Sequence, residues 1–218
     1  MKLYHFITSQ YGLDAIKYKR LKIARINELN DPFEFLSLSL SREERKIIRN
    51  WKNKMHSQYG LICMSKEWQH PLLWSHYAES HRGMCLGFDV IDDGTFSKVR
   101  YLSRRENLKD FGYTSMNEFT ETDMKKLLFS KFNVWSYESE YRSFCTLEEN
   151  EEDSNLYFCP FSMHMKLSEI IIGERSNVTR DQVANALGNY GKDILAFKAR
   201  CAFRDFRIVR NQNKSAWK

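Results

Sequence analysis

The chain has 218 residues, of which 42% are hydrophobic and 28% charged, and its formal net charge is +6. This balance predicts a globular protein with a sizeable core and argues against a low-complexity chain. No apolar run reaches the roughly 18–20 residues of a membrane-spanning helix, and the N-terminus lacks a signal-peptide pattern. The five cysteines include no CxxC pair, which favours reduced thiols over disulfides or a zinc ribbon. We therefore expect a cytoplasmic protein without a membrane partner.

The first half of the chain mixes short strand and helix patterns. Ser41 and Glu44 form a capping-box pattern, and Pro71 is placed to open a helix that stops near Gly83. We expect strands at 3–7, 21–23, 61–64 and 84–90, a turn at 8–12, a loop at 27–33, and helices at 13–16, 41–55 and 71–78.

The second half ends in strands. Thr120 is expected to cap a helix with the apolar face Met124, Leu127, Leu128 and Phe132, and Thr179 to cap another that ends at Gly191. We expect extended segments at 141–147, 157–166, 170–172, 194–201 and 205–210. The irregular alternation predicts a single α+β domain over residues 1–218, with a mixed, largely antiparallel sheet flanked by helices.

The charge is concentrated near the C-terminus. Residues 192–218 hold eight basic and two acidic residues, which accounts for the whole net charge of +6. Residues 148–153 are the acidic counterpart and predict a solvated loop. The basic residues predict either the exposed face of an outer strand or a surface that attracts nucleic acid through its phosphates. The candidates for the second interpretation are Lys198, Arg200, Arg204, Arg207 and Arg210.

Four clusters combine polar and aromatic residues, and we expect most of these residues to line one concave site. The candidates are Tyr4, His5 and Thr8, then Asn30 and Asp31, then Trp74, His76 and Tyr77, and finally Glu138, Glu140 and Arg142.

Each cluster also has a structural interpretation. His5 fits a hydrogen-bonded core histidine, and the Asn30–Asp31 pair fits simple turn chemistry. Glu138 fits an ion pair with Arg142, while Glu140 lies deeper on the strand and is the preferred catalytic carboxylate. His76 and Glu79 are only two candidate ligands, so we expect no metal.

The chain resembles a bacterial and phage family, the domain of unknown function 2971. The segments that carry the resemblance are LYHF (3–6), RLKIARINELNDPFE (20–34), PLLWSHYAESHRGMCLGFD (71–89), LLFSKFNVWSYESEYRSF (127–144) and LSEIIIGE (167–174).

A more distant similarity is to ADP-ribosyltransferases. It implies that His5 binds the ribose of NAD, that Tyr77 flanks the nicotinamide, and that the Glu138–Ser139–Glu140 pair stabilises the developing oxocarbenium ion. The Ser-Thr-Ser strand of those enzymes is missing from this sequence.

These resemblances imply an intracellular NAD-dependent ADP-ribosyltransferase or NAD glycohydrolase, acting as an effector in phage defence, with NAD as substrate. A nucleic-acid-binding or nucleic-acid-processing module that uses the basic C-terminal face is an open alternative. A non-catalytic interaction or sensor module is another. The sequence does not predict the oligomeric state.

Overall fold

The computed structural model of the protein describes residues 1–147, 155–190 and 193–218. The predicted acidic loop at 148–153 and the predicted helix-ending Gly191 lie outside these ranges. The chain forms two compact units, each assembled from separate stretches of sequence. The prediction of one domain over residues 1–218 stays a prediction beside this division.

The first unit comprises Met1–Lys22, Met64–Asp93 and Phe158–Lys218. Its elements are β1 (Lys2–Ile7), α1 (Ser9–Tyr18), β2 (Arg20–Lys22), α3 (Pro71–Tyr77), β5 (Met84–Val90), β10 (Phe158–Pro160), β11 (Met165–Ile172), α5 (Arg180–Leu187), β12 (Leu195–Cys201) and β13 (Ile208–Arg210).

The second unit comprises Ile23–Cys63 and Gly94–Tyr157. Its elements are β3 (Ala24–Arg25), α2 (Arg42–Gln58), β6 (Ser97–Lys98), β7 (Arg100–Leu102), α4 (Glu121–Leu128), β8 (Ser130–Phe132) and β9 (Glu140–Thr146). Strand β4 (Tyr59–Ser65) begins in this unit and ends in the first.

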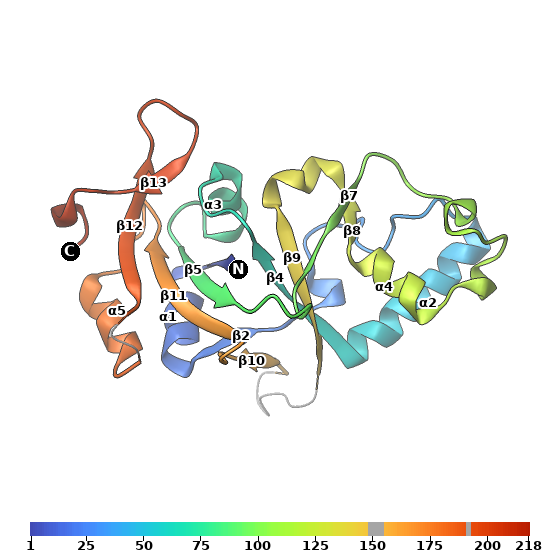
Figure 1. The fold of residues 1–218 in the computed structure, drawn as a ribbon, viewed down its shortest axis with the longest axis horizontal. Helices are drawn as coiled ribbons and strands as arrows, with labels where there is room; N and C mark the ends of the chain where they lie inside the picture. Colours follow the sequence, from blue (N-terminus) through green and yellow to red (C-terminus); the bar gives the residue numbers. More distant parts are fainter. Residues whose placement is uncertain (148–154, 191–192) are drawn as a thin grey trace. The chain divides into compact units, whose positions relative to one another are not determined.

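In the described part of the chain, nine strands form one mixed sheet (Figure 1). Their order is β13-β12-β11-β5-β1-β4-β9-β6, and β3 pairs with β4. The pairs β1–β5 and β5–β11 are antiparallel, whereas β11 and β12 run parallel. Strands β2 and β10 form a separate antiparallel pair, and β7 and β8 a parallel one. The predicted α+β class, with a mixed sheet flanked by helices, is confirmed.

Helices cover both faces of the sheet in the first unit. On one face, Trp74 of α3 packs with Cys85, Ile171 and Phe197, and its ring meets Phe6 edge-on at 5.3 Å. On the other face α1 approaches so closely that a Cβ on Gly12 would lie 2.3 Å from Met84 Sδ. A side chain at position 12 would therefore displace Met84, and glycine permits the close approach of α1 to the sheet.

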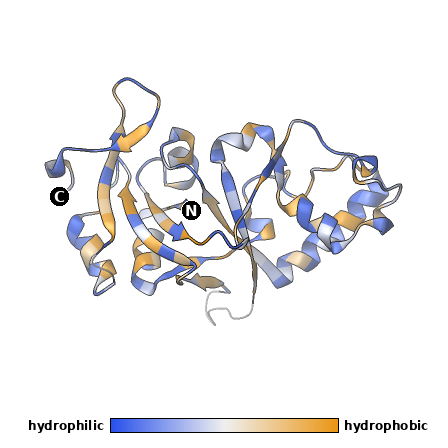
Figure 2. Cartoon of the chain, viewed as in Figure 1, coloured by the Kyte–Doolittle hydropathy of each residue, from blue (hydrophilic) through white to orange (hydrophobic). Residues whose placement is uncertain are grey.

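The second unit has its own apolar clusters. Phe35, Met55, Leu61 and Leu128 pack in one cluster, and a second cluster gathers residues of α2 and α4 that include Ile48 and Leu127. Helix α2 is mostly hydrophilic (Figure 2), and only Ile48 and Met55 among its residues are buried. It is thus an amphipathic helix with a narrow apolar face.

Helix starts follow the sequence closely. The hydroxyl groups of Ser41, Thr120 and Thr179 each accept a bond from the amide three residues on, as the capping patterns predict. Pro71 occupies the first turn of α3.

Two helix ends and one turn differ from the prediction. Helix α4 ends at Leu128, so Phe132 does not lie on its apolar face but in β8, where it is exposed. Helix α5 ends at Leu187, next to Gly188 with a positive φ of 52°. The predicted turn at 8–12 is the first turn of α1, which begins at Ser9.

Candidate functional site

The second unit buries five charged side chains in contact with one another. Glu34, Lys131, Glu138, Glu140 and Arg142 are each 5% exposed or less, and we call them the buried ion network. Charges this deep require partners, because an isolated buried ion costs several kcal/mol.

Arg142 is the centre of the network. Its guanidinium donates to both oxygens of Glu34 and to both oxygens of Glu140, where Nε lies 2.8 Å from Oε1. It also donates to the backbone oxygen of Leu128 at the end of α4. Two bidentate carboxylate pairs are the arrangement for which a guanidinium is best suited.

Lys131 is the second cation of the buried ion network. Its Nζ lies 2.5 Å from Glu138 Oε2, 3.3 Å from Glu140 Oε2 and 3.9 Å from Glu34 Oε1. The amine also lies 4.9 Å from the centre of the Trp135 ring, a cation–π distance. Lys131 therefore contacts all three carboxylates of the network.

Local backbone geometry places these carboxylates. A 3₁₀ turn, Asn133–Glu138, ends at Ser139, whose φ of 44° reverses the chain direction before β9 begins at Glu140. Alternation along β9 then puts Glu140 and Arg142 on the same face of the strand. In the loop before α2, Asp31 Oδ1 accepts a hydrogen bond from the amide of Phe33. This turn positions Glu34, the next residue.

The network carries two cations and three carboxylates. Burial raises the pKa of Glu34, despite the opposing charge of Arg142. Burial acts on Glu140 in the same direction, but the charges of Arg142 and Lys131 outweigh it and lower the pKa of Glu140 to about 2. Burial also raises the pKa of the Cys63 thiol, which donates a hydrogen bond to Glu140. The pKa of Glu140 is thus lowered and that of Glu34 raised, although both carboxylates pair with Arg142.

These contacts bear on the two roles considered for Glu138 and Glu140. Arg142 pairs with Glu140 and Glu34, so the Glu–Arg ion pair expected at the start of β9 forms with Glu140. Both oxygens of Glu140 already accept from Arg142 or Lys131. The geometry therefore favours the ion-pair interpretation for Glu140.

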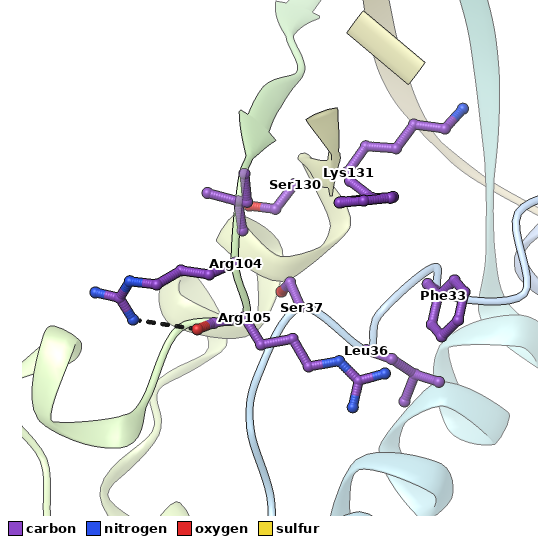
Figure 3. Close-up of a pocket in the computed structure, with 9 residues that line it drawn as sticks. Phe33, Leu36, Ser37, Arg104, Arg105, Ser130 and Lys131 are labelled. Carbon is purple, nitrogen blue, oxygen red and sulfur yellow. Dashed lines mark hydrogen bonds between the residues drawn. The ribbon is translucent and has the colours of Figure 1, made fainter. Parts of the chain in front are cut away.

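A pocket of about 220 Å³ lies beside the network, and Lys131 belongs to both. It is lined by Phe33, Leu36, Ser37, Leu102, Arg104, Arg105, Ser130, Lys131 and Phe132. In Figure 3 the Lys131 amine points away from the labelled arginines, so the stem of this side chain forms the wall.

The polar groups of the pocket are few. The Arg105 guanidinium lies 5.5 Å from the Phe33 ring centre, and Arg104 pairs with Asp110 at 3.3 Å. The Ser37 hydroxyl is buried and has no hydrogen-bond partner in the described part of the chain. The two exposed guanidinium groups are the polar groups suited to an oxygen-rich ligand.

The N-terminal candidates lie in the first unit. The Tyr4 hydroxyl is 3.4 Å from Glu169 Oε2, and burial, then the charge of Glu169, raises its pKa. Thr8 precedes α1 without capping it through its side chain. His5 pairs across the sheet with Leu86 and, by alternation, faces the α1 side with Ile7, opposite to Phe6.

The helical candidates lie on α3, on the other face of β1. Trp74 is fully buried in the core, and its indole donates to the backbone oxygen of Trp68 at 2.6 Å. His76 is exposed and its ring lies 6.1 Å from that of Tyr77. His5 and the α3 residues therefore do not share one site. Asn30 and Asp31 belong to the second unit, where Asn30 is exposed.

The basic candidates near the C-terminus differ in their surroundings. Lys198 donates to the backbone oxygen of Ser176, and Arg210 lies over the Phe197 ring at 5.0 Å. Arg200, Arg204 and Arg207 lie in or beside the connection between β12 and β13. Strand β12 has β11 and β13 on its two sides, so it is not the outer strand of the sheet. Leu195, the first residue of β12, is exposed.

The sequence did not single out Glu34, Lys131, Arg104 or Arg105. For Glu34 and Lys131 the sequence does contain a signal. Glu140 and Arg142 lie on one face of a strand, and these charged side chains need charged partners if that face is buried. For the arginines of the pocket there is none, since an Arg-Arg pair in a loop is normally solvated.

No family model, curated protein or solved structure matches the chain. The resemblances noted from sequence segments therefore stay predictions. Across residues 1–147, 155–190 and 193–218, no group of three His, Cys, Asp or Glu side chains is placed to hold a metal ion. No helix in these ranges is both long enough and apolar enough to cross a membrane.

Removal of the central cation tests the network. Arg142→Gln leaves three buried carboxylates with only Lys131, so we expect it to destabilise the protein by about 3–5 kcal/mol. Glu34→Gln removes the surplus negative charge and should lower the free energy of unfolding clearly less than Arg142→Gln does. Urea unfolding at neutral pH compares the two variants, and equal losses would contradict the charge imbalance inferred here.

The titration of Glu140 gives a second prediction. Its folded-state pKa of about 2 lies below the ordinary 4.5, so the unfolded chain binds the proton more readily. The stability that Glu140 contributes is then complete above pH 4.5 and is lost as the pH falls toward 2. Wild type should therefore lose more unfolding free energy over this window than Glu140→Gln, which cannot titrate. Parallel pH profiles for the two proteins would refute the assignment.

Proposed function

We propose that the protein binds a nucleotide in the pocket of the second unit, with NAD as the first candidate. The observation that carries the proposal is the combination of aromatic rings and arginines around one cavity. A nucleotide has the same two parts, a planar ring and phosphate oxygens.

The ring side is formed by exposed aromatic groups. Phe33 is 52% exposed and Phe132 46%, and Leu36 and Leu102 add apolar surface. Exposed phenylalanine rings stack favourably with a planar base, because every base has a π-face.

The phosphate side is formed by Arg105 and Arg104. Among the described residues Arg105 forms no ion pair, so its donors remain available. A guanidinium binds phosphate oxygens with two parallel hydrogen bonds. The pocket is smaller than the ~300–1,000 Å³ usual for whole ligands, so we place a ring-sized part of NAD inside it and the phosphates along the arginines.

Reversal of one charge tests the binding. We expect NAD to raise the thermal midpoint of the wild type and Arg105→Glu to weaken the affinity about 10-fold or more, since a charge-assisted bond is worth about 1.5–3 kcal/mol. The matched control is Lys109→Glu, an exposed residue outside the pocket with the same charge change. The proposal fails if NAD, ADP-ribose and ATP all leave the midpoint unchanged, or if both variants weaken binding equally.

NAD cleavage is a further part of the proposal. It is motivated by the position of Glu138 and Glu140 behind Lys131 in the pocket wall, and it requires the Lys131 side chain to move so that Glu140 can face the ribose. In hydrolysis the ribose–nicotinamide C–N bond breaks, nicotinamide leaves with the electron pair, and water adds to the ribose carbon and releases a proton. An ionised carboxylate stabilises the positive charge that develops on the sugar.

Turnover is tested with Glu140→Gln and, as control, Glu43→Gln on the exposed face of α2. If Glu140 stabilises the oxocarbenium ion, NAD consumption should fall by about 10²–10³-fold in the first variant only. A wild type that consumes no NAD, with water or any acceptor, ends the transferase proposal. Binding, measured separately, is judged by its own result.

A further inference from the structure

We propose that the connection between β12 and β13 binds single-stranded nucleic acid. We call residues 202–207 the hairpin tip; it lies in the first unit and belongs to no part of the nucleotide pocket. In Figure 1 this connection extends beyond the end of β12. The proposal is independent of the function proposed above.

Two phenylalanines at the tip have almost no contact with the protein. Phe206 is 99% exposed and Phe203 89%. Turns are normally built from Gly, Asn, Asp, Ser and Pro, which have conformational or hydrogen-bonding reasons to be there. A single exposed apolar residue needs no explanation, but two rings on one short tip indicate a contact surface.

The base of the tip is fixed. Cys201 pairs with Ile208 across the two strands, and the amide of Ala202 donates to the backbone oxygen of Arg207 at 2.9 Å. Ile208 is buried in the core of the unit, and its amide donates to the backbone oxygen of Gln69. The backbone that carries the rings is therefore anchored before any ligand arrives, which lowers the ordering cost of binding.

Cations stand beside the rings. The Arg200 guanidinium lies 4.3 Å from the centre of the Phe203 ring, and Arg204 follows that ring in sequence. Arg207 pairs with Asp205 at 2.8 Å, and Arg204 has no ion pair in the described part of the chain. Three arginines against one aspartate leave a net charge of +2 within a few residues of both rings.

This pattern fits a single strand better than other polyanions. Each nucleotide offers a base for stacking and a phosphate for a cation, and the tip alternates rings and arginines in the same way. In a duplex the bases are already stacked on one another and offer the rings only groove edges. A membrane surface would need a wider apolar face than two rings for stable attachment.

A small tip implies modest affinity with a defined salt dependence. If all three arginines contact phosphates, the logarithm of the binding constant should fall with the logarithm of salt concentration with a slope of about −2, from roughly −0.7 per phosphate contact on a single strand. Stacking adds a part that salt does not screen. The two contributions can therefore be separated experimentally.

The experiment measures fluorescence anisotropy of a labelled oligothymidylate with wild type and two variants. Phe203→Ala/Phe206→Ala should weaken binding about 5-fold or more per stacked base and leave the salt slope unchanged. Arg204→Glu should weaken binding and make the slope shallower. The controls are Met163→Ala, another strongly exposed apolar residue of the first unit, and Arg82→Glu, an exposed arginine outside the tip. Because all these side chains are exposed, thermal midpoints should stay close to that of the wild type.

The proposal is overturned if the wild type does not bind the oligonucleotide at low salt, or if the double phenylalanine variant binds as tightly as wild type. It is also overturned if a duplex of equal length binds more tightly than the single strand. Co-sedimentation with vesicles of anionic phospholipid that depends on the two phenylalanines, without oligonucleotide binding, would assign the tip to a membrane surface instead.

Discussion

The second unit depends on one buried guanidinium. Arg142 joins three segments that are distant in sequence: the loop that carries Glu34, the end of α4 at Leu128, and β9 with Glu140. An arginine in this position cannot give up its proton, so its partners must be present whenever the unit is folded. Such a cation is weak support for stability in itself, because hydrophobic residues of similar volume often do as well. Its value is geometric, since two bidentate pairs accept only one relative placement of the two carboxylates.

Lys131 connects this constraint to the surface. The amine is directed into the network, while the stem of the side chain forms part of the pocket wall (Figure 3). Its neighbours in β8 complete the arrangement: Phe132 lines the pocket, and the Ser130 hydroxyl donates to the backbone oxygen of Lys126 and accepts from the Arg100 guanidinium. A ligand that shifts β8 would therefore move the amine that three carboxylates share. The pocket and the network therefore share one short strand, β8.

Local chemistry was predictable from the sequence, whereas long-range pairing was not. The three side-chain caps and the strand at 84–90 follow from patterns a few residues long, and the structure has them as expected. Glu34 and Arg142 are 108 positions apart, and no local pattern links them. The prediction that Phe132 lies on the apolar face of a helix was wrong for a different reason. Its spacing continues the apolar face of α4, but the chain leaves the helix after Leu128 and pairs with β7, which periodicity alone does not detect. The same limit applies to the hairpin tip, because residues 205–210 were expected to be strand and the strand begins only at Ile208.

Positive charge acts differently where it is paired and where it is not. The cations of the network are buried with an excess of carboxylate, so they add nothing to attraction at a distance. The exposed cations do attract anions at a distance. On α2 the residues Arg42, Arg45, Lys46 and Arg49 follow the spacing of one helix face, and none forms an ion pair with a described residue. Arg204 in the hairpin tip of the first unit likewise forms no ion pair with a described residue. Fields from such groups extend about 10 Å at 0.1 M salt and are screened beyond that distance. Anionic ligands are therefore attracted over a short range to these surfaces. Where a surface also presents exposed aromatic rings, as the pocket and the hairpin tip do, stacking would add contacts that salt does not weaken.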